Sequence, residues 1–302
     1  YLNKYYWIRK IFVNNFFSKF VSQKTLNKIV FNSIYKSNHW NKNQKFDYSQ
    51  SYSGPGSVAN SIQTNNLMNK NVFVHNLGLL DYQKAVEYQT NLFNNIIDQK
   101  LKNRKSNIKS QTENHLIFVE HPNVYTLGKS GDLNNLLLSK EDLKRKEIQF
   151  FNTNRGGDIT CHGPGQIVCY PIFDLDNFFT DIHKYLRFLE EVVILTLNEY
   201  GINSQRSSNE TGVWIDPRLE SARKICAMGV KASRWVTMHG FALNVNNDLS
   251  YFKNIIPCGI SNKSVTSIGK ELGNEVNISE IIKKLIKNFE EIFSATLVKT
   301  IN

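Results

Sequence analysis

A cysteine between a proline and a glycine is the residue whose surroundings best suit covalent chemistry. Pro257 restricts the backbone before Cys258, and Gly259 leaves the space around the sulfur open. A loop cysteine in this setting adds little to packing, which favours a nucleophile over a buried structural thiol. The thiolate is the reactive form, and an ammonium beside it would stabilise it. Lys224 could supply that charge, although spacing alone does not bring it next to Cys258.

A glycine-rich stretch at residues 155–166, with the sequence RGGDITCHGPGQ, is typical of a ligand-binding loop. Its glycines allow close approach of the backbone to a ligand, Arg155 offers a charge, and His162 offers a donor or a base. A tight turn with Arg155 in solvent would explain the same residues. The number of glycines within so few positions favours the binding loop. It is not a P-loop, because the Gly-x-x-x-x-Gly-Lys-Ser/Thr pattern is missing.

A third cluster comprises residues 224–231 (KICAMGVK) and 237–245 (TMHGFALNV), which read as two strands. Strand alternation predicts that Lys224, Cys226 and Met228 share one face of the first strand. Gly229 and Gly240 interrupt these strands, which marks close approach of a ligand or of another backbone. Cys226 is expected to be a small buried residue rather than a reactive thiol.

Two alternative chemistries use the same residues. Cys161, His162, His239 and Cys258 have side chains that zinc prefers, but no pair has the usual ligand spacing, so no metal is expected. A hydrolase dyad of Cys258 with His239 as its base stays possible, because dyads are defined in space.

The elements that must position these residues alternate irregularly. Helical spacing of apolar residues after the N-cap Asp81 predicts a long helix, and Ser139 with Asp142 predicts a capped short one. Strands and helices lack a strict βαβ order, so we expect an α+β fold with a mixed β-sheet covered by helices. The predicted strands cover residues 72–74, 116–119, 124–127, 158–161, 166–173, 212–215, 224–230 and 237–245, and the predicted helices cover 81–101, 139–146, 180–200 and 279–295.

Charge is distributed unevenly along the 302 residues. The net charge is +11, and residues 1–46 hold nine basic residues and no acidic one. The remaining chain carries only +2, which argues against a nucleic-acid-binding module. Residues 1–46 are typical of an organellar transit segment, and a species-specific disordered extension is the alternative. Residues 47–70 are typical of a polar linker. Residues 71–302 form the predicted catalytic domain. Four sparse cysteines indicate a reducing compartment, and no apolar run is long enough for a membrane span.

Together these motifs, in order and spacing, resemble the lipoyl(octanoyl) transferase family, often called LipB. The resemblance covers residues 71–295 and includes TGVW at 211–214, PCG at 257–259 and the 34-residue separation of Lys224 and Cys258. One departure is Cys161, where the family usually has tyrosine. The resemblance implies a fold similar to biotin and lipoate protein ligase catalytic domains. An ATP-dependent ligase of the same superfamily is the second reading, but it does not need the Cys258 thiol.

The family implies transfer of an octanoyl group from octanoyl-acyl carrier protein to a lysine of a lipoyl domain, in 2-oxoacid dehydrogenase subunits or the glycine-cleavage H protein. Cys258 would form the acyl-thioester and Lys224 would lower its pKa and relay protons. Because a thioester is exchanged for an amide, we expect no cofactor and no ATP. We also expect a monomer in a plastid or mitochondrion. The implied substrate-binding residues are Arg155, Gly156, Gly157, Asp158, Ile159, Thr160, Cys161, His162, Ala227, Met228, Gly229, His239, Gly240 and Phe241.

Overall fold

A mixed β-sheet organises the part of the chain that the computed structural model describes, residues 68–106, 110–208, 210–256 and 264–299. Within those ranges the sheet has nine strands in the order β12-β1-β2-β6-β10-β9-β8-β7, with β11 beside β9. The strands are β1 (Asn71–Leu79), β2 (His115–Glu120), β6 (Gln166–Ile172), β7 (Gln205–Arg206), β8 (Val213–Ile215), β9 (Arg223–Ser233), β10 (Val236–Asn244), β11 (Ser264–Val265) and β12 (Thr296–Lys299).

Parallel and antiparallel pairing are divided between regions of this sheet. β1 is parallel to both β2 and β12, whereas β2, β6, β10, β9, β8 and β7 pair antiparallel in that order. β11 lies parallel to β9, with Val265 opposite Lys224. The chain between β10 and β11 therefore returns to the strand that carries Lys224.

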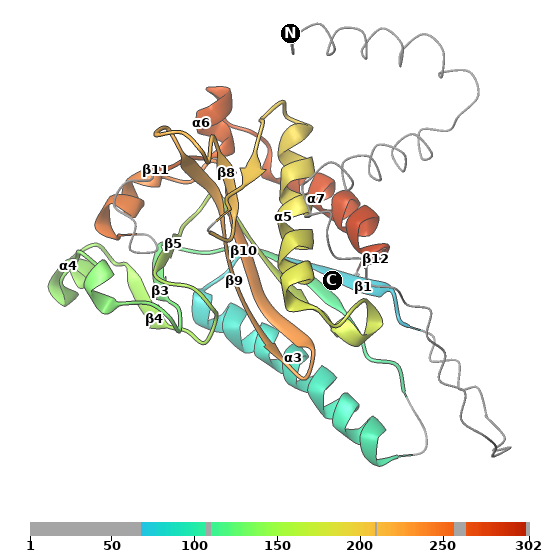
Figure 1. The fold of residues 1–302 in the computed structure, drawn as a ribbon. Coiled ribbons are helices and arrows are strands. Elements are labelled where there is room, and N and C mark those ends of the chain that lie inside the picture. The colour runs from blue at the N-terminus through green and yellow to red at the C-terminus, as the bar shows by residue number, and fades with distance from the viewer. Residues whose placement is uncertain (1–67, 107–109, 209, 257–263, 300–302) are drawn as a thin grey trace, which may run out of the picture. The chain divides into compact units, whose positions relative to one another are not determined.

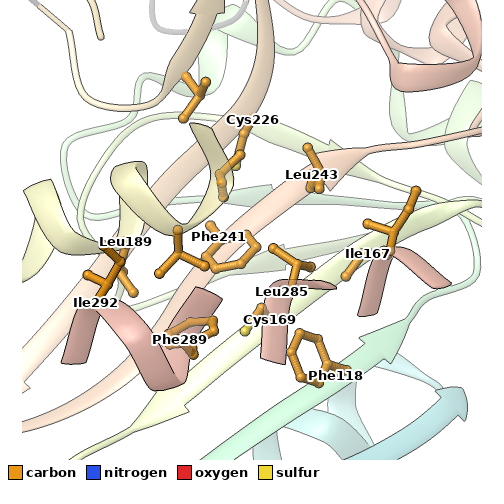
Figure 2. Close-up of a cluster of buried hydrophobic side chains, with 14 of the residues drawn as sticks. Phe118, Ile167, Cys169, Leu189, Cys226, Phe241, Leu243, Leu285, Phe289 and Ile292 are labelled. Atoms are coloured by element: carbon orange, nitrogen blue, oxygen red, sulfur yellow. The ribbon is translucent and has the colours of Figure 1, made fainter. Parts of the chain in front are cut away.

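Helices cover both faces of the sheet (Figure 1). The helices α5 (Ile182–Asn198) and α7 (Ile278–Phe293) pack on one face, and α3 (Tyr82–Lys105) packs on the other. Figure 2 shows the core on the α5 and α7 side, where Leu189, Leu285 and Phe289 meet Phe241. Burial of these apolar side chains is the main stabilising contribution to such a layered domain.

A smaller sheet of β3 (Val124–Leu127), β4 (Gln149–Asn152) and β5 (Thr160–His162) has the order β4-β3-β5. It shares a third core with α4 (Lys140–Arg145), whose Leu143 packs near Tyr125 and Phe252. The 3-10 segment Leu249–Asn254 and the short helix α6 (Ile268–Leu272) follow β10 and β11. Residues 155–162, the first part of the glycine-rich stretch, lead into and include β5. They are called the 155–162 loop.

The predicted α+β class is confirmed, and so are the local helix signals. Asp81 accepts hydrogen bonds from the amides of Gln83 and Lys84, and Ser139 with Asp142 forms the predicted capping box. Short strands that depend on distant partners, including β4, β11 and β12, are additions. In the described ranges, every helix is too short or too polar to cross a membrane.

Candidate active site

A cavity of about 410 Å³ lies where β9, β10, β6 and the 155–162 loop meet, within the size of roughly 300–1,000 Å³ usual for ligand pockets. Apolar side chains such as Val168, Ala242 and Val230 contribute to its wall, while Tyr82, Gln166 and Asn244 add polar groups. The predicted site residues that line it are Lys224, Arg155, Gly156, Gly157, Asp158, Ile159, Thr160, His162, Ala227, Met228, Gly229, His239, Gly240 and Phe241.

Cys161 is the described site residue that does not line the cavity. It pairs with Tyr125 in the small sheet, and its side chain packs in the core that includes Phe252. Burial raises the pKa of its thiol to about 12, so it remains protonated. The predicted place of Cys161 at the binding site is thus corrected, and strand alternation explains why. Thr160 and His162 face one side of β5, and Cys161 between them faces the other.

Lys224 reaches the cavity because β9 contains a bulge. Val213 pairs with Cys226 while Trp214 pairs with Lys224, so one extra residue, Ile225, is accommodated on β9. Ile225 and Cys226 both enter the core beside α5, whereas the Lys224 ammonium lies 4.6 Å from the centre of the Trp214 ring. The prediction that Lys224 and Cys226 share a face is therefore wrong, because alternation is broken between them. The prediction that Cys226 is a small buried residue is confirmed.

A buried carboxylate supports the segment behind Lys224. Glu190, fully buried on α5, accepts a hydrogen bond of 3.0 Å from the amide of Gly212 and also binds Arg206 and Arg187. A Cβ at Gly212 would lie 2.6 Å from the carbonyl oxygen of Cys226 and 3.6 Å from the Lys224 side chain. Only glycine fits here, so Glu190 and Gly212 together set the wall against which Lys224 packs.

Arg155 is buried rather than solvated. Its guanidinium donates to the carbonyl and hydroxyl oxygens of Thr126 at 2.7 and 2.9 Å and to the carbonyl of Gly156 at 3.0 Å. A Cβ at Gly229 would lie 2.5 Å from the Gly156 carbonyl oxygen, and one at Gly240 would lie 2.1 Å from that of Cys169. Both glycines thus permit close approach of another backbone, which was one of the two predicted reasons for them. Arg155 and its glycine neighbours form a fixed wall of the cavity.

Two histidines of the cavity are neutral. Burial and the neighbouring cation of Arg155 lower the pKa of His239 to about 3; burial, then His121, lowers that of His162 to the same value. His239 has a φ of +59°, an unusual backbone conformation, and its amide donates to Gln89 Oε1 at 2.9 Å. Its Nε2 lies 2.7 Å from Asn154 Oδ1. Such a weak base does not favour the alternative of a Cys258–His239 dyad.

Cys258 lies outside the described residues, but the chain on both sides of its segment reaches the cavity. Phe252 and Val265 line the wall, and the amide of Thr266 donates to the Lys224 carbonyl at 2.9 Å. The other three cysteines are buried, and burial raises the pKa of Cys169 and Cys226 well above its usual value. None of those three is placed to act as a thiolate.

Sequence reasoning missed several polar residues of the site. Gln166 ended a motif but was given no role, and Asn244 was read as part of a strand, yet both are buried and line the cavity. Gln89, which no motif indicated, is buried on α3 and accepts a hydrogen bond from the His239 amide through its Oε1. A buried amide on an otherwise apolar strand or helix face is the signal that could have identified them. Across the described residues, no group of three or more His, Cys, Asp or Glu is arranged to hold a metal ion.

The family follows from comparison with known proteins. Residues 81–290 match the model of a protein family described as the lipoyl protein ligase A/B catalytic domain. The chain belongs to this family. A relative from Christiangramia forsetii, named octanoyltransferase, is 64% identical over 76% of this chain and 99% of its own length. An octanoyltransferase from Flavobacterium psychrophilum is 60% identical over 76% of this chain and its whole length. The predicted resemblance to octanoyltransferases is confirmed, and with it the enzyme class, an acyltransferase.

Solved structures of lipoate protein ligases share the fold of this family member. A bipartite lipoate protein ligase from Thermoplasma acidophilum has a TM-score of 0.56 at 16% identity, over 77% of this chain and 87% of that one. A lipoate-protein ligase A bound with ATP has a TM-score of 0.54 at 15% identity, over 78% and 90%. These likenesses confirm the predicted fold.

The predicted organellar location is wrong. Relatives with 60–64% identity come from Christiangramia and Flavobacterium species, which are bacteria and contain neither plastids nor mitochondria. The interpretation of residues 1–46 as a transit segment depended on such an organelle and loses its basis. Those residues lie outside the described part of the chain.

Proposed function

We propose that this family member transfers an octanoyl group from octanoyl-acyl carrier protein to the lysine amine of a lipoyl domain through a thioester on Cys258. The observation that carries the proposal is the position of Lys224 at an acyl-sized cavity, on the strand to which the chain returns after Cys258. The acceptors would be lipoyl domains of 2-oxoacid dehydrogenase subunits or of the glycine-cleavage H protein.

The cavity suits a medium-length acyl chain. The small side chains of Ala227 and Ala242, a cross-strand pair of β9 and β10, line the cavity, and Val168 and Ile159 extend the apolar wall. Burial of most of an eight-carbon chain contributes about 5 kcal/mol, at ~0.8 kcal/mol for each methylene. Such anchoring would hold the thioester carbonyl near the Lys224 end of the cavity.

The burial of the other three cysteines supports Cys258 as the nucleophile. The chain has four cysteines, and the three described ones are buried thiols with raised pKa values. Cys258 is two residues from Ile256 and six from Ser264, which pairs with Arg223 beside Lys224. At roughly 3.3–3.6 Å for each residue, this length of chain would permit contact between the Cys258 sulfur and Lys224. The ammonium of Lys224 would favour the thiolate.

The reaction then proceeds in two steps, acylation of Cys258 and transfer of the acyl group to the acceptor lysine. The Cys258 thiolate attacks the thioester carbonyl, a new carbon–sulfur bond forms, and the carrier thiolate leaves and takes up a proton. The neutral amine of the acceptor lysine next attacks the acyl-enzyme, a carbon–nitrogen bond forms, and the Cys258 sulfur leaves as a thiolate. Lys224 would relay the amine proton. Exchange of a thioester for an amide is favourable, so the transfer needs no ATP.

Intact mass measurement tests this proposal. Octanoyl-acyl carrier protein should add one octanoyl group to the wild type without ATP and none to Cys258→Ser. Cys226→Ala, which removes a buried thiol outside the cavity, should still be acylated. An active wild type without the adduct would contradict the thioester mechanism, and a requirement for ATP would favour a ligase instead. Addition of a lipoyl domain should discharge the octanoyl group onto its lysine.

A further inference from the structure

A row of buried side-chain amides, hydroxyls and one imidazole runs along the cavity from the 155–162 loop to the strand of Lys224. Its members are at most 6% exposed and come from β3, β5, β6, β10 and the residue that follows β11. They are Thr126, His162, Gln166, Asn244 and Thr266. Because every such group needs a partner when buried, the orientation of each one constrains the next.

Two backbone carbonyls fix the direction of these hydrogen bonds. Asn244 Nδ2 donates to the Thr266 carbonyl at 2.9 Å, so Asn244 Oδ1 faces Gln166. Gln166 Nε2 therefore donates to Asn244 Oδ1 at 2.8 Å, and it also donates to the Cys161 carbonyl at 3.1 Å. A flipped amide would set oxygen against oxygen at both contacts, so Gln166 Oε1 must face His162.

This orientation determines the tautomer of His162. Its Nδ1 lies 2.7 Å from Gln166 Oε1, an acceptor, and must carry the proton. Its Nε2 is then a lone pair, 3.4 Å from the hydroxyl of Thr126, which itself accepts a hydrogen bond from Arg155. The Thr126 hydroxyl donates to this lone pair, so His162 is not an oxyanion donor.

The other end of the row reaches Lys224. Thr266 accepts from Asn244 through its carbonyl and donates through its amide to the Lys224 carbonyl at 2.9 Å. Its hydroxyl donates to Glu271, whose carboxylate binds Arg223, the neighbour of Lys224. Arg155 and Lys224, which both line the cavity, are therefore joined by one directed set of hydrogen bonds.

We propose that Gln166 is a positioning residue that holds His162 as its Nδ1–H tautomer and, through Asn244 and Thr266, ties the acyl-binding loop to the backbone of Lys224. The inference deepens the proposed octanoyl transfer and rests on it for its effect on rate. The tautomer itself does not depend on that function. The His162 imidazole is surrounded by Tyr82, whose ring is stacked on it with 6.1 Å between the ring centres, and by His121 and Arg155.

Nitrogen-15 NMR of histidine-labelled full-length protein tests the tautomer without any substrate. The resonance that disappears in His162→Gln should have the Nδ1–H pattern in the wild type. In Gln166→Met, which keeps the length but lacks the acceptor, the Nε2–H pattern should appear. Asn288→Leu removes a buried amide elsewhere, between α5 and α7, and should keep the Nδ1–H pattern of the wild type. An Nε2–H wild type, or an unchanged pattern in Gln166→Met, would overturn the inference.

Steady-state kinetics test the link to Lys224. Asn244→Leu removes the donor to Thr266 and should lower kcat about tenfold, the effect of roughly one lost hydrogen bond, with little change in KM for the octanoyl donor. Asn288→Leu is the matched control, since Asn288 is also a buried amide but donates to Thr196 between α5 and α7. Equal kcat losses in the two variants would refute the link. An inactive wild type would instead refute the proposed function and leave the NMR result standing.

Discussion

Lys224 and Cys226 lie two residues apart on β9, yet their side chains point to opposite faces of the sheet. The extra residue Ile225 breaks the alternation, so the ammonium enters the cavity and the thiol enters the core. A regular strand would bury the Lys224 charge among apolar side chains, at a cost of several kcal/mol. The bulge is thus the feature that makes this lysine available to chemistry.

Replacement of Lys224 by methionine should remove the charge but keep the apolar stem. We expect an unchanged Tm and a raised Cys258 pKa, with alkylation at pH 7 slowed about 10- to 1,000-fold, since a close opposite charge shifts a pKa by 1–3 units. The rate of iodoacetamide alkylation against pH measures this. Lys231→Met, on the same strand beside Phe93, is the control and should match the wild type. Identical profiles for all three proteins would count against the role of Lys224.

An alanine at Gly229 should disturb the wall of the cavity. Its Cβ would lie 2.5 Å from the Gly156 carbonyl oxygen and 3.2 Å from Arg155 Cδ, so the loop must move. Overpacking of this kind costs about 1–3 kcal/mol, and we expect octanoate affinity measured by calorimetry to fall about tenfold or more.

Gly201→Ala separates this effect from general loss of stability. Gly201 has a φ of +75° but no atom near its Cβ position, so alanine costs about 1–2 kcal/mol in stability alone. Its octanoate affinity should equal that of the wild type. If Gly229→Ala also bound octanoate normally, the close packing of β9 against the loop would have no part in binding.

Five of the described histidines are buried, and burial lowers the pKa of each, which should make the protein sensitive to acid. Burial lowers the pKa of His115 to about 4 and those of His162 and His239 to about 3, below the unfolded value near 6.5. Between these limits the unfolded chain binds protons that the folded chain does not, so stability falls as the pH falls from 6.5 towards 3. Each histidine contributes a slope of up to about 1.4 kcal/mol for each pH unit.

Urea unfolding at pH 7 and pH 5.5 measures this slope. We expect an uptake of about three protons from His115, His162 and His239 on unfolding at pH 5.5, and about one fewer in His239→Asn. Uptake of less than one proton by the wild type would show that the imidazoles are already charged in the folded protein.

Loss of the Glu190 charge should lower the stability of the folded protein. Glu190→Gln leaves Arg187 and Arg206 without their buried partner and weakens the hold on Gly212. Burial raises the pKa of Glu190 and both arginines are partly exposed, so the loss is about 1.5–3 kcal/mol, that of a hydrogen bond to a charged group, and a fall in Tm is expected. Glu191→Gln removes a partly exposed carboxylate that binds the same Arg206 and should cost less than about 1 kcal/mol. Similar Tm values for the two variants would contradict this account of Glu190.

Local chemistry made parts of the fold predictable. The N-cap at Asp81 and the capping box of Ser139 and Asp142 depend on residues within one turn, and both were identified from the sequence. The strand β12 was missed because its four residues are held by β1, more than two hundred positions earlier. Its own composition does not distinguish it from a tail.

The site shows the same division between local and distant signals. Glycine-rich motifs identified Arg155, Gly229 and Gly240, because close approach of two backbones requires glycine, which is visible in the sequence. The inward turn of Lys224 depends on pairing with β8, and the place of Cys161 depends on pairing with Tyr125. Neither partner can be read from the spacing of the motif itself.

The parallel pairing of β1 with β12 sets Asn71 opposite Thr296, so the described domain starts and finishes at one edge of its sheet. The strands that wall the cavity, β6, β10 and β9, lie farther along the same sheet. Affinity tags or fused partners added at either end would therefore enter the fold away from the strands that line the cavity. An evolving gene could likewise gain or lose terminal extensions without rebuilding that cavity.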